Sequence, residues 1–363
     1  MRIALLTAIP NPGNRVGNHV FNVSEKRPPN GIGFLYALLV QAGHQVNIFD
    51  RYCGDTGWPD NDFADYDVFG VYCATICTND IAYIIYKSKA KRIIVGGPHA
   101  ALFPKWFNRF DGKVNTVVCG EAEKVIVPLV GGTILSTEIN TQRLTDTDLE
   151  LLPPFPYNIF RNEKYRYLYN WTFPFDSTNP IFTMNTSRGC PFSCTFCSVK
   201  NIWGRSISYM SAERIFSDIK YVQTLGARGI YFREDNFTLN NDRVAKLCEL
   251  LIEANANIKW ACETRVDTIP SSLMILMKQA GCIGFYVGVE HGSQKMLDIF
   301  KKGVTIEKII DFFDCVNALE IKTAVSIITG HPQETATDVA LLNALTARIK
   351  PNIIWGNEFR EDG

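Results

Sequence analysis

Short apolar runs alternate with amphipathic stretches along the first 130 residues. The runs are rich in β-branched residues, which is typical of buried strands, and they lie at 2–7, 46–49, 68–72, 92–95 and 115–118. Apolar residues with helical spacing fill the segments 33–43, about 79–90 and about 122–130. Because the strands are apolar throughout and alternate with helices, the pattern predicts a Rossmann-like parallel sheet with helices on both faces.

A second series of strands and helices begins at residue 181. The expected strands are 182–187, 229–234, 258–263, 282–290, 323–329 and 352–358. The first helix of this series is predicted by Ile215, Ile219 and Val222 on one face, with Ser211 as its N-cap and Gly226 at its end. Six strand–helix units predict a partial (β/α)6 TIM-type barrel, whose active site lies at the carboxyl ends of the strands.

The segment between the two series is rich in proline and aromatic residues. We therefore expect a Rossmann-like domain at 1–135, a linker at 136–180 packed across both domains, and a barrel domain at 181–363. The aromatic tract at 165–175 could hang over the active site, but we favour a role as hydrophobic packing between the domains.

Composition narrows the class of protein. A chain of 363 residues is long for one domain, and 46% hydrophobic residues suffice for packed cores. Lys plus Arg and Asp plus Glu are both 37, so no global field attracts nucleic acid or an anionic membrane. The apolar start of the chain is too short for a secretory signal, and no segment approaches the ~20 apolar residues of a membrane helix. Eleven cysteines without a paired framework indicate a reducing compartment. We expect a cytoplasmic protein with neither membrane nor nucleic-acid partners.

Three cysteines in one loop are the strongest chemical signal. Cys190, Cys194 and Cys197 follow the spacing Cys-x3-Cys-x2-Cys, so their sulfurs can converge without help from elsewhere in the fold. A 4Fe-4S cluster normally takes four thiolates, and three leave one iron open to a ligand. Zinc would want a fourth ligand nearby, whereas the next cysteine is Cys248. A 4Fe-4S cluster is therefore favoured over zinc, a disulfide or inert thiols.

This spacing, with Phe196 between the second and third cysteines, resembles the signature of the radical SAM superfamily. In that superfamily S-adenosylmethionine (SAM) chelates the open iron, and electron transfer into its sulfonium releases a 5'-deoxyadenosyl radical. The resemblance implies that Phe196 lies beside the adenine, and that a reductant such as flavodoxin or ferredoxin supplies the electron.

The ends of the second and third barrel strands carry groups that the resemblance assigns to SAM. Glu234, Asp235 and Asn236 follow the second strand, where the superfamily places acceptors for the amino group of SAM. Glu263 and Arg265 follow the third strand, and Arg265 suits a carboxylate of SAM or of the substrate.

The later strands complete this resemblance. Glu290 matches the residue that holds a ribose hydroxyl, and backbone at Ile328 and Gly330 would meet the adenine. His291 stands where the family usually has serine, so it could donate a proton or contact the substrate.

The first domain resembles the cobalamin-binding Rossmann domain that precedes many radical SAM cores. The matching segments are 29–33, 43–50, 96–99 and 120–123. The resemblance implies cofactor contacts at Thr75, Gly96, Gly97, Pro98, His99, Gly120 and Glu121. No Asp-x-His-x-x-Gly motif exists, so no histidine of that motif would ligate cobalt.

Some residues of this rim have simpler interpretations. His99 could contact a cofactor, but a histidine beside Gly-Gly-Pro more often caps the following helix or lies in solvent. A second metal at Cys73, Cys77 and Cys119 is conceivable, and buried structural thiols are favoured. The domain itself could also persist without a corrinoid, as a scaffold or a lid over the substrate.

Taken together, the resemblance implies an enzyme that cleaves SAM reductively, with cobalamin-dependent methylation of an unactivated carbon of a small molecule or peptide as the leading reaction. Two alternatives stay open: a cobalamin-independent oxidation, cyclisation or rearrangement, and an iron-sulfur electron-transfer or sensing protein. A methylthiotransferase is disfavoured because no second cluster set lies near the N-terminus. Similar enzymes commonly carry a further domain after the sixth strand, which helps to close over the substrate. Here we expect the barrel to be closed by the first domain with the aromatic tract, by a large substrate, or by a part of the protein that this sequence does not include.

Overall fold

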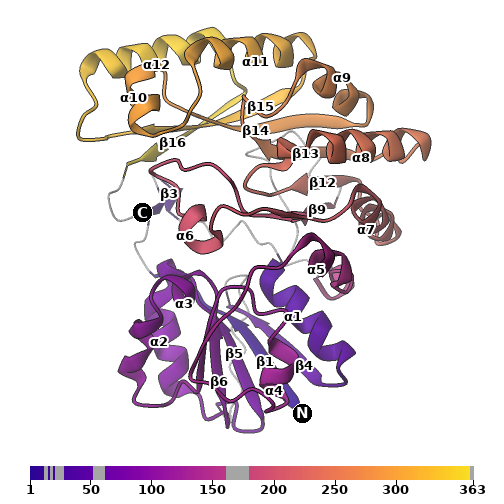
Figure 1. The fold of residues 1–363 in the computed structure, drawn as a ribbon, viewed down its shortest axis with the longest axis vertical. Coiled ribbons are helices and arrows are strands. Elements are labelled where there is room, and N and C mark those ends of the chain that lie inside the picture. Colours follow the sequence, from indigo (N-terminus) through magenta and orange to yellow (C-terminus); the bar gives the residue numbers. More distant parts are fainter. Residues whose placement is uncertain (12–14, 17–18, 21–27, 52–61, 161–179, 360–363) are drawn as a thin grey trace. The chain divides into compact units, whose positions relative to one another are not determined.

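The computed structural model describes residues 1–11, 15–16, 19–20, 28–51, 62–160 and 180–359 (Figure 1). The chain divides into two compact units, which we call unit 1 (Met1–Arg15 and Val20–Arg166) and unit 2 (Val16–His19 and Tyr167–Gly363). Each contains a six-stranded sheet. The aromatic tract at 165–175 lies outside the described residues, and the predicted domain boundaries stay a prediction.

The sheet of unit 1 is parallel throughout. Its strand order is β4 (Gln45–Asp50), β1 (Arg2–Thr7), β5 (Val68–Tyr72), β6 (Ile93–Gly96), β7 (Thr116–Cys119) and β8 (Glu138–Asn140). The five predicted strands are all present. The sequence pattern missed β8, because three residues with two exposed side chains carry no apolar run.

Helices cover both faces of this sheet. Ile3 and Leu5 of β1 pack with α1 (Asn30–Gln41) and α4 (Ile126–Val130), whereas Ala4 and Leu6 pack with α2 (Thr78–Lys87) and α3 (Pro98–Leu102). Alternate side chains of one strand thus enter two separate cores, which is what a strand buried on both faces requires. The predicted doubly covered parallel sheet is confirmed.

The first part of the predicted linker packs onto unit 1. It contains α5 (Asp146–Leu151) and the 3-10 turn η4 (Tyr157–Phe160). The ring of Phe155 meets Phe34 of α1 edge to face at 5.4 Å and stacks on Phe160 at the same centroid distance. These aromatic contacts fix the described part of the linker against α1.

The sheet of unit 2 is also parallel, and its strands follow one another in chain order. They are β9 (Ile181–Met184), β12 (Gly229–Phe232), β13 (Lys259–Thr264), β14 (Cys282–Glu290), β15 (Lys322–Thr329) and β16 (Ile353–Glu358). An open parallel sheet in sequential order is the arrangement expected of a partial barrel. All six predicted strands are present.

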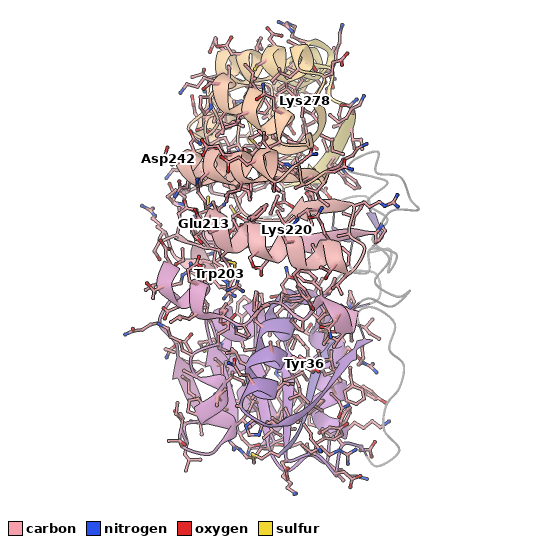
Figure 2. The ribbon with its side chains drawn as sticks, turned by 90° about the vertical axis from the view of Figure 1, so that its right-hand side faces the viewer. Tyr36, Trp203, Glu213, Lys220, Asp242 and Lys278 are labelled. Atoms are coloured by element: carbon pink, nitrogen blue, oxygen red, sulfur yellow. The ribbon has the colours of Figure 1, made fainter. Side chains whose placement is uncertain are left out.

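Helices line up along the outer side of this sheet (Figure 1). They are α7 (Ala212–Thr224), α8 (Asn241–Glu253), α9 (Ser271–Gln279), α10 (Gln294–Ile299), α11 (Ile306–Ala318) and α12 (Ala336–Ile349). The predicted face of α7 is fully buried, and the Ser211 side chain caps the helix by accepting from the amide of Arg214. Polar side chains occupy the outer faces, as Figure 2 shows at Glu213, Lys220, Asp242 and Lys278.

None of the helices in the described part of the chain is both long enough and apolar enough to span a membrane.

Candidate active site

The cysteine loop is anchored at both ends and in its middle. The short strands β10 (Ser187–Arg188) and β11 (Ser208–Tyr209) pair antiparallel on either side of it. In the middle, the amide of Thr195 donates to the carbonyl of Phe300 at 2.9 Å. The loop is therefore positioned by unit 2 itself before any cofactor binds.

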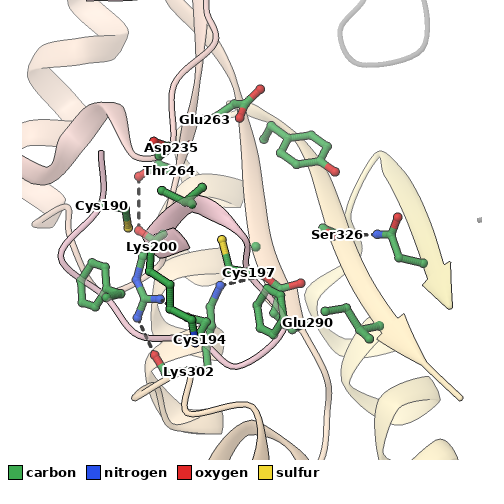
Figure 3. A pocket seen from close by; sticks show the side chains of 18 of the residues that line it. Cys190, Cys194, Cys197, Lys200, Asp235, Glu263, Thr264, Glu290, Lys302 and Ser326 are labelled. Carbon is green, nitrogen blue, oxygen red and sulfur yellow. Dashed lines mark hydrogen bonds and ion pairs between the residues drawn. The ribbon is translucent and has the colours of Figure 1, made fainter. Parts of the chain in front are cut away.

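All three cysteines line one cavity of about 420 Å³ within unit 2 (Figure 3). The cavity also receives at least one side chain from the end of every later strand of the sheet. Its other predicted members are Phe196, Asp235, Glu263, Arg265, Glu290 and Ile328. The carboxyl ends of the strands thus meet at one site, as the barrel geometry requires.

Three thiolates in one loop form a donor set suited to an iron-sulfur cluster. Among the described residues, no group of three His, Cys, Asp or Glu side chains is arranged to hold one metal ion. In a cube each sulfur ligates a different iron, so the sulfurs stand further apart than around one zinc ion. Burial raises the pKa of Cys190 and Cys197, so iron binding there has to displace their protons.

Arg265 connects the cysteine loop to the rest of the site. Its Nε and Nη2 each donate to the Asp267 carboxylate at 2.9 Å, and Nη2 also donates to the carbonyl of Lys302 at 2.6 Å. Nη1 lies 3.6 Å from the sulfur of Cys194, and the guanidinium lies 3.7 Å from the ring centroid of Phe192. Burial acts to lower the pKa of Arg265, but the hydrogen bonds and charge of Asp267, together with Cys194 and Cys190, outweigh it, so the pKa is raised.

A buried ion pair lines the cavity beside the cysteine loop. Glu290 Oε1 accepts from Lys302 Nζ at 2.7 Å, and both side chains are less than 8% exposed (Figure 3). Glu290 has φ +65°, in the left-handed region, and the register of β14 against β15 shifts between Gly288 and Glu290. A Cβ at Gly288 would lie 2.4 Å from Glu290 Oε1 and 2.6 Å from Lys302 Nζ. Glycine is therefore what leaves room for the pair.

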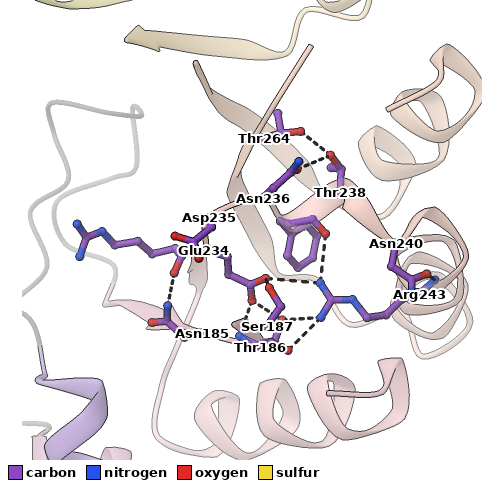
Figure 4. A network of polar contacts seen from close by, with 12 residues as sticks. Asn185, Thr186, Ser187, Glu234, Asp235, Asn236, Thr238, Asn240, Arg243 and Thr264 are labelled. Atoms are coloured by element: carbon purple, nitrogen blue, oxygen red, sulfur yellow. Dashed lines mark hydrogen bonds and ion pairs between the residues drawn. The ribbon is translucent and has the colours of Figure 1, made fainter. Parts of the chain in front are cut away.

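Glu234 does not line the cavity. Its carboxylate is buried and accepts from the Thr186 amide and hydroxyl and from the Ser187 hydroxyl, and it pairs with Arg243 Nη2 at 3.5 Å (Figure 4). These bonds use the carboxylate to join the ends of β9 and β12, and the predicted contact of Glu234 with SAM stays a prediction.

Asn236 is likewise outside the cavity. Its Oδ1 accepts from the hydroxyls of Thr238 at 3.3 Å and Thr268 at 3.2 Å. Of the three residues predicted after the second strand, the structure brings only Asp235 to the cavity, where its carboxylate accepts from the amide of Gly189 at 3.3 Å.

His291 is fully buried and also lies outside the cavity. Its Nδ1 accepts from the amide of Ser293 at 3.0 Å, so the proton is on Nε2, which donates to Glu334 at 2.8 Å. The other carboxylate oxygen of Glu334 accepts from the amide of Gly330. Both ring nitrogens of His291 are thus bonded inside the protein, and the histidine fixes the loop after β15. This role differs from the predicted one, in which His291 donates a proton or contacts the substrate. Gly330 does not line the cavity either.

Sequence reasoning missed several lining residues: Phe192, Lys200, Tyr286, Lys302 and Asn357. Asn357 comes at the end of the last predicted strand and could have been found by the strand-end rule. Burial raises the pKa of Tyr286 to about 12, so its hydroxyl stays protonated as a donor. Lys302 comes from the turn after α10, and nothing in the local pattern marks it.

Most of the residues predicted to contact cobalamin in unit 1 are packed against, or hydrogen-bonded to, other residues of the chain. A Cβ at Gly97 would lie 2.9 Å from the Cys73 carbonyl, and one at Gly120 would lie 2.5 Å from Thr141 Oγ1, so both glycines are required by the chain's own packing. Glu121 is buried and accepts from the amide of Leu144 at 2.7 Å. Thr75 is exposed, and Gly96 and Pro98 are partly exposed at the carboxyl end of the sheet.

His99 is buried, contrary to the expectation of a helix cap or a solvent position. Nδ1 lies 3.2 Å from Thr75 Oγ1, and the ring packs against Phe103, Trp106 and Phe107. Burial, and then the charge of Arg109, lower its pKa, so the ring is neutral. Nε2 is buried and has no hydrogen-bond partner among the described residues.

The three cysteines predicted at the rim of unit 1 have structural roles. The thiols of Cys73, Cys77 and Cys119 donate to the carbonyls of Val71, Ala8 and Ala100. Burial raises the pKa of all three, that of Cys77 to about 12. Neutral, hydrogen-bonded thiols agree with the favoured prediction over a second metal.

Residues 184–345 match the family model of the Radical SAM superfamily. An uncharacterized methyltransferase of Pyrococcus horikoshii is 28% identical over 340 residues, covering 86% of this chain and 71% of that protein. The anaerobic magnesium-protoporphyrin IX monomethyl ester cyclase of Rubrivivax gelatinosus is 29% identical over 192 residues, covering 52% of this chain. This chain spans only 33% of the cyclase.

A solved structure shares the fold. The radical S-adenosylmethionine methyltransferase TsrM of Kitasatospora setae, solved with cobalamin and a 4Fe-4S cluster bound, superposes with a TM-score of 0.77. The superposition covers 98% of this chain and 74% of TsrM at 15% identity. At that identity the match establishes the fold.

Proposed function

We propose, from the premise that residues 184–345 form a radical SAM domain, that this chain is a radical SAM enzyme that methylates an unactivated carbon with the help of cobalamin. The observation that carries the proposal is the convergence of Cys190, Cys194 and Cys197 on one cavity at the carboxyl ends of six parallel strands. These sulfurs would hold a 4Fe-4S cluster, which would supply the electron for cleavage of SAM to methionine and a 5'-deoxyadenosyl radical.

The remaining lining residues supply what SAM needs. Asp235 and Glu263 are carboxylates at the cavity, suited to accept from the protonated amino group of SAM. Glu290 uses Oε1 for Lys302, which holds the carboxylate where its second oxygen can accept from a ribose hydroxyl. Phe196 and Ile328 give the cavity an apolar side on which an adenine can lie.

Unit 1 is the proposed site of cobalamin, which would supply the transferred methyl group. In this parallel sheet the chain adds β4 on one side of β1 and then β5 on the other, so the strand order reverses between β1 and β5. Ligands bind beyond the carboxyl ends of the strands at such a point. Thr75, Gly96 and Pro98 are the predicted contacts open at that edge. Further support comes from the fold match to TsrM, whose structure contains cobalamin.

The substrate is proposed to be a small molecule or a peptide, and the electron donor a flavodoxin or ferredoxin in the cytoplasm. A cobalamin-independent oxidation, cyclisation or rearrangement is the second candidate. It is favoured by one observation, namely that a cyclase is among the relatives that match this chain in sequence.

The test is SAM cleavage by the full chain after anaerobic reconstitution with iron and sulfide. We expect about four irons per chain and 5'-deoxyadenosine after addition of dithionite. Cys197→Ala should lower 5'-deoxyadenosine formation at least a hundredfold. Cys315→Ala is the matched control, because this partly exposed thiol does not line the cavity.

Methyl transfer is tested with SAM deuterated on its methyl group, cobalamin and candidate substrates. A product that gains the labelled methyl group supports the leading reaction. A product without it, formed at the same rate with and without cobalamin, would establish the second candidate instead. A wild-type chain that binds no iron would contradict both.

A further inference from the structure

The guanidinium of Arg265 is held in place from several sides. It is 5% exposed, and three of its N–H groups go to the Asp267 carboxylate and the Lys302 carbonyl. The plane lies 3.7 Å from the ring centroid of Phe192, which belongs to the cysteine loop itself. A planar cation fixed by a bidentate carboxylate and an aromatic ring has little freedom to turn.

This geometry leaves Arg265 poorly placed to receive a carboxylate. The fork of Nε and Nη2, which would bind a carboxylate bidentately, is already occupied by Asp267. A carboxylate of SAM or substrate would have to displace that buried partner. The nitrogen left for the cavity is Nη1, and it lies 3.6 Å from the sulfur of Cys194.

Resting on the function proposed above, we infer that Arg265 is a positioning residue that donates to the Cys194 sulfur and thereby raises the reduction potential of the iron-sulfur cluster. Hydrogen bonds to ligand sulfurs, net charge and burial are the means by which a protein sets this potential. Reduction adds negative charge to the cluster, so a fixed cation and an N–H donor at a sulfur stabilise the reduced form.

The effect is concentrated at one of the three ligands. Cys194 is 7% exposed, whereas Cys190 and Cys197 are partly exposed. Solvent and salt screen a charge at a buried contact much less than at an exposed one. Asp267 opposes the effect of the cation, but it binds the other side of the guanidinium, away from Nη1.

The experiment is a redox titration of the reconstituted full chain, followed by EPR of the reduced cluster in the absence of SAM. Arg265→Gln should make reduction about tenfold less favourable, which is a midpoint shift of 59 mV to more negative values for one electron. Arg265→Lys keeps the charge but loses the fork, so its shift should be smaller. Arg348→Gln is the control, because Arg348 pairs with Asp314, which does not line the cavity, and its side chain is 51% exposed.

A second variant separates electrostatic tuning from loosening of the loop. Asp267→Asn removes an anion and leaves Arg265 its contacts with Lys302 and Phe192, so its potential should become less negative. Opposite shifts in the two variants support the inference, since mere loosening would move both in one direction. EPR reports only loaded protein, so a lower iron content does not obscure the result.

An unchanged potential in Arg265→Gln, or shifts of the same sign in both variants, would overturn the inference and leave the proposed function standing. A wild-type chain without a cluster would remove the proposed function and the inference together.

Discussion

At the residue scale, the contrast between Cys194 and Glu234 separates what a sequence can and cannot predict. Three thiols within eight residues meet because the loop is short, so their chemistry is local. Glu234 follows a strand as predicted, but its direction depends on Thr186, which is 48 residues away in sequence, and on Arg243 of the following helix α8. Side chains at strand ends point either to the cavity or to the neighbouring strand, and only packing decides between the two.

Gly288 offers a sharp test at this scale. Gly288→Ala should displace the Glu290–Lys302 pair, because the new Cβ would lie within 2.6 Å of both charged groups. We expect destabilisation of about 1–3 kcal/mol from overpacking and at least tenfold weaker SAM binding, measured by calorimetry on reconstituted protein.

The matched control is Gly356→Ala on β16, where a Cβ would meet nothing within 4 Å. Equal loss of SAM binding in the two variants would contradict the role of the pair.

At the scale of elements, the long strands and the helices could be predicted from the pattern of apolar residues. The two-residue strands could not. β10 and β11 contain two residues each and are defined only by their pairing across the cysteine loop. The positions that patterning predicted well, such as the buried face of α7, are those where one helix face alone decides burial.

The N-terminus of α12 is fixed by Asp338, and this makes stability depend on pH. Asp338 forms a capping box with Thr335 and accepts from Lys295 Nζ at 2.7 Å and Ser293 Oγ at 2.6 Å. The hydrogen bond from Lys295, followed by those from Ser293 and Thr335, holds its pKa well below the usual range.

Because the folded pKa lies below the unfolded one, the stabilisation is complete above an ordinary carboxyl pKa of about 3.9 and is lost as pH falls below it. Asp338→Asn should lower Tm by about 2–4 °C at pH 7, and the difference from wild type should shrink below pH 4.

Thermal melts between pH 3 and 7 measure this, with Asp311→Asn on the exposed face of α11 as the control. A difference that stays constant across this range would mean that the Asp338 charge does not contribute.

At the scale of the whole molecule, two parallel sheets and the polar ends of their strands could be predicted, because chain order and hydrophobicity determine them. The exact contacts at the edge of unit 1 could not. His99 and Glu121 turned inward to partners on other elements, and no local pattern encodes such partners.

Loading the cluster should affect one unit and leave the other unchanged. Ligand binding stabilises the folded segment that holds it, so we expect slower amide exchange in peptides covering 187–209 and those containing Arg265 and Lys302. Hydrogen exchange read by mass spectrometry compares the reconstituted and iron-free protein. Peptides of α2 and α4 in unit 1 should not change, and protection spread evenly over both units would argue against a local site.

The left-handed backbone at Glu290 constrains how this cavity can evolve. That conformation costs a residue other than glycine about 1–3 kcal/mol, so glycine would relieve it. Yet losing the carboxylate would strand the buried ammonium of Lys302, at a cost of about 3–5 kcal/mol. A substitution of either residue alone therefore destabilises the protein, so we expect Glu290 and Lys302 to be retained or replaced together during evolution.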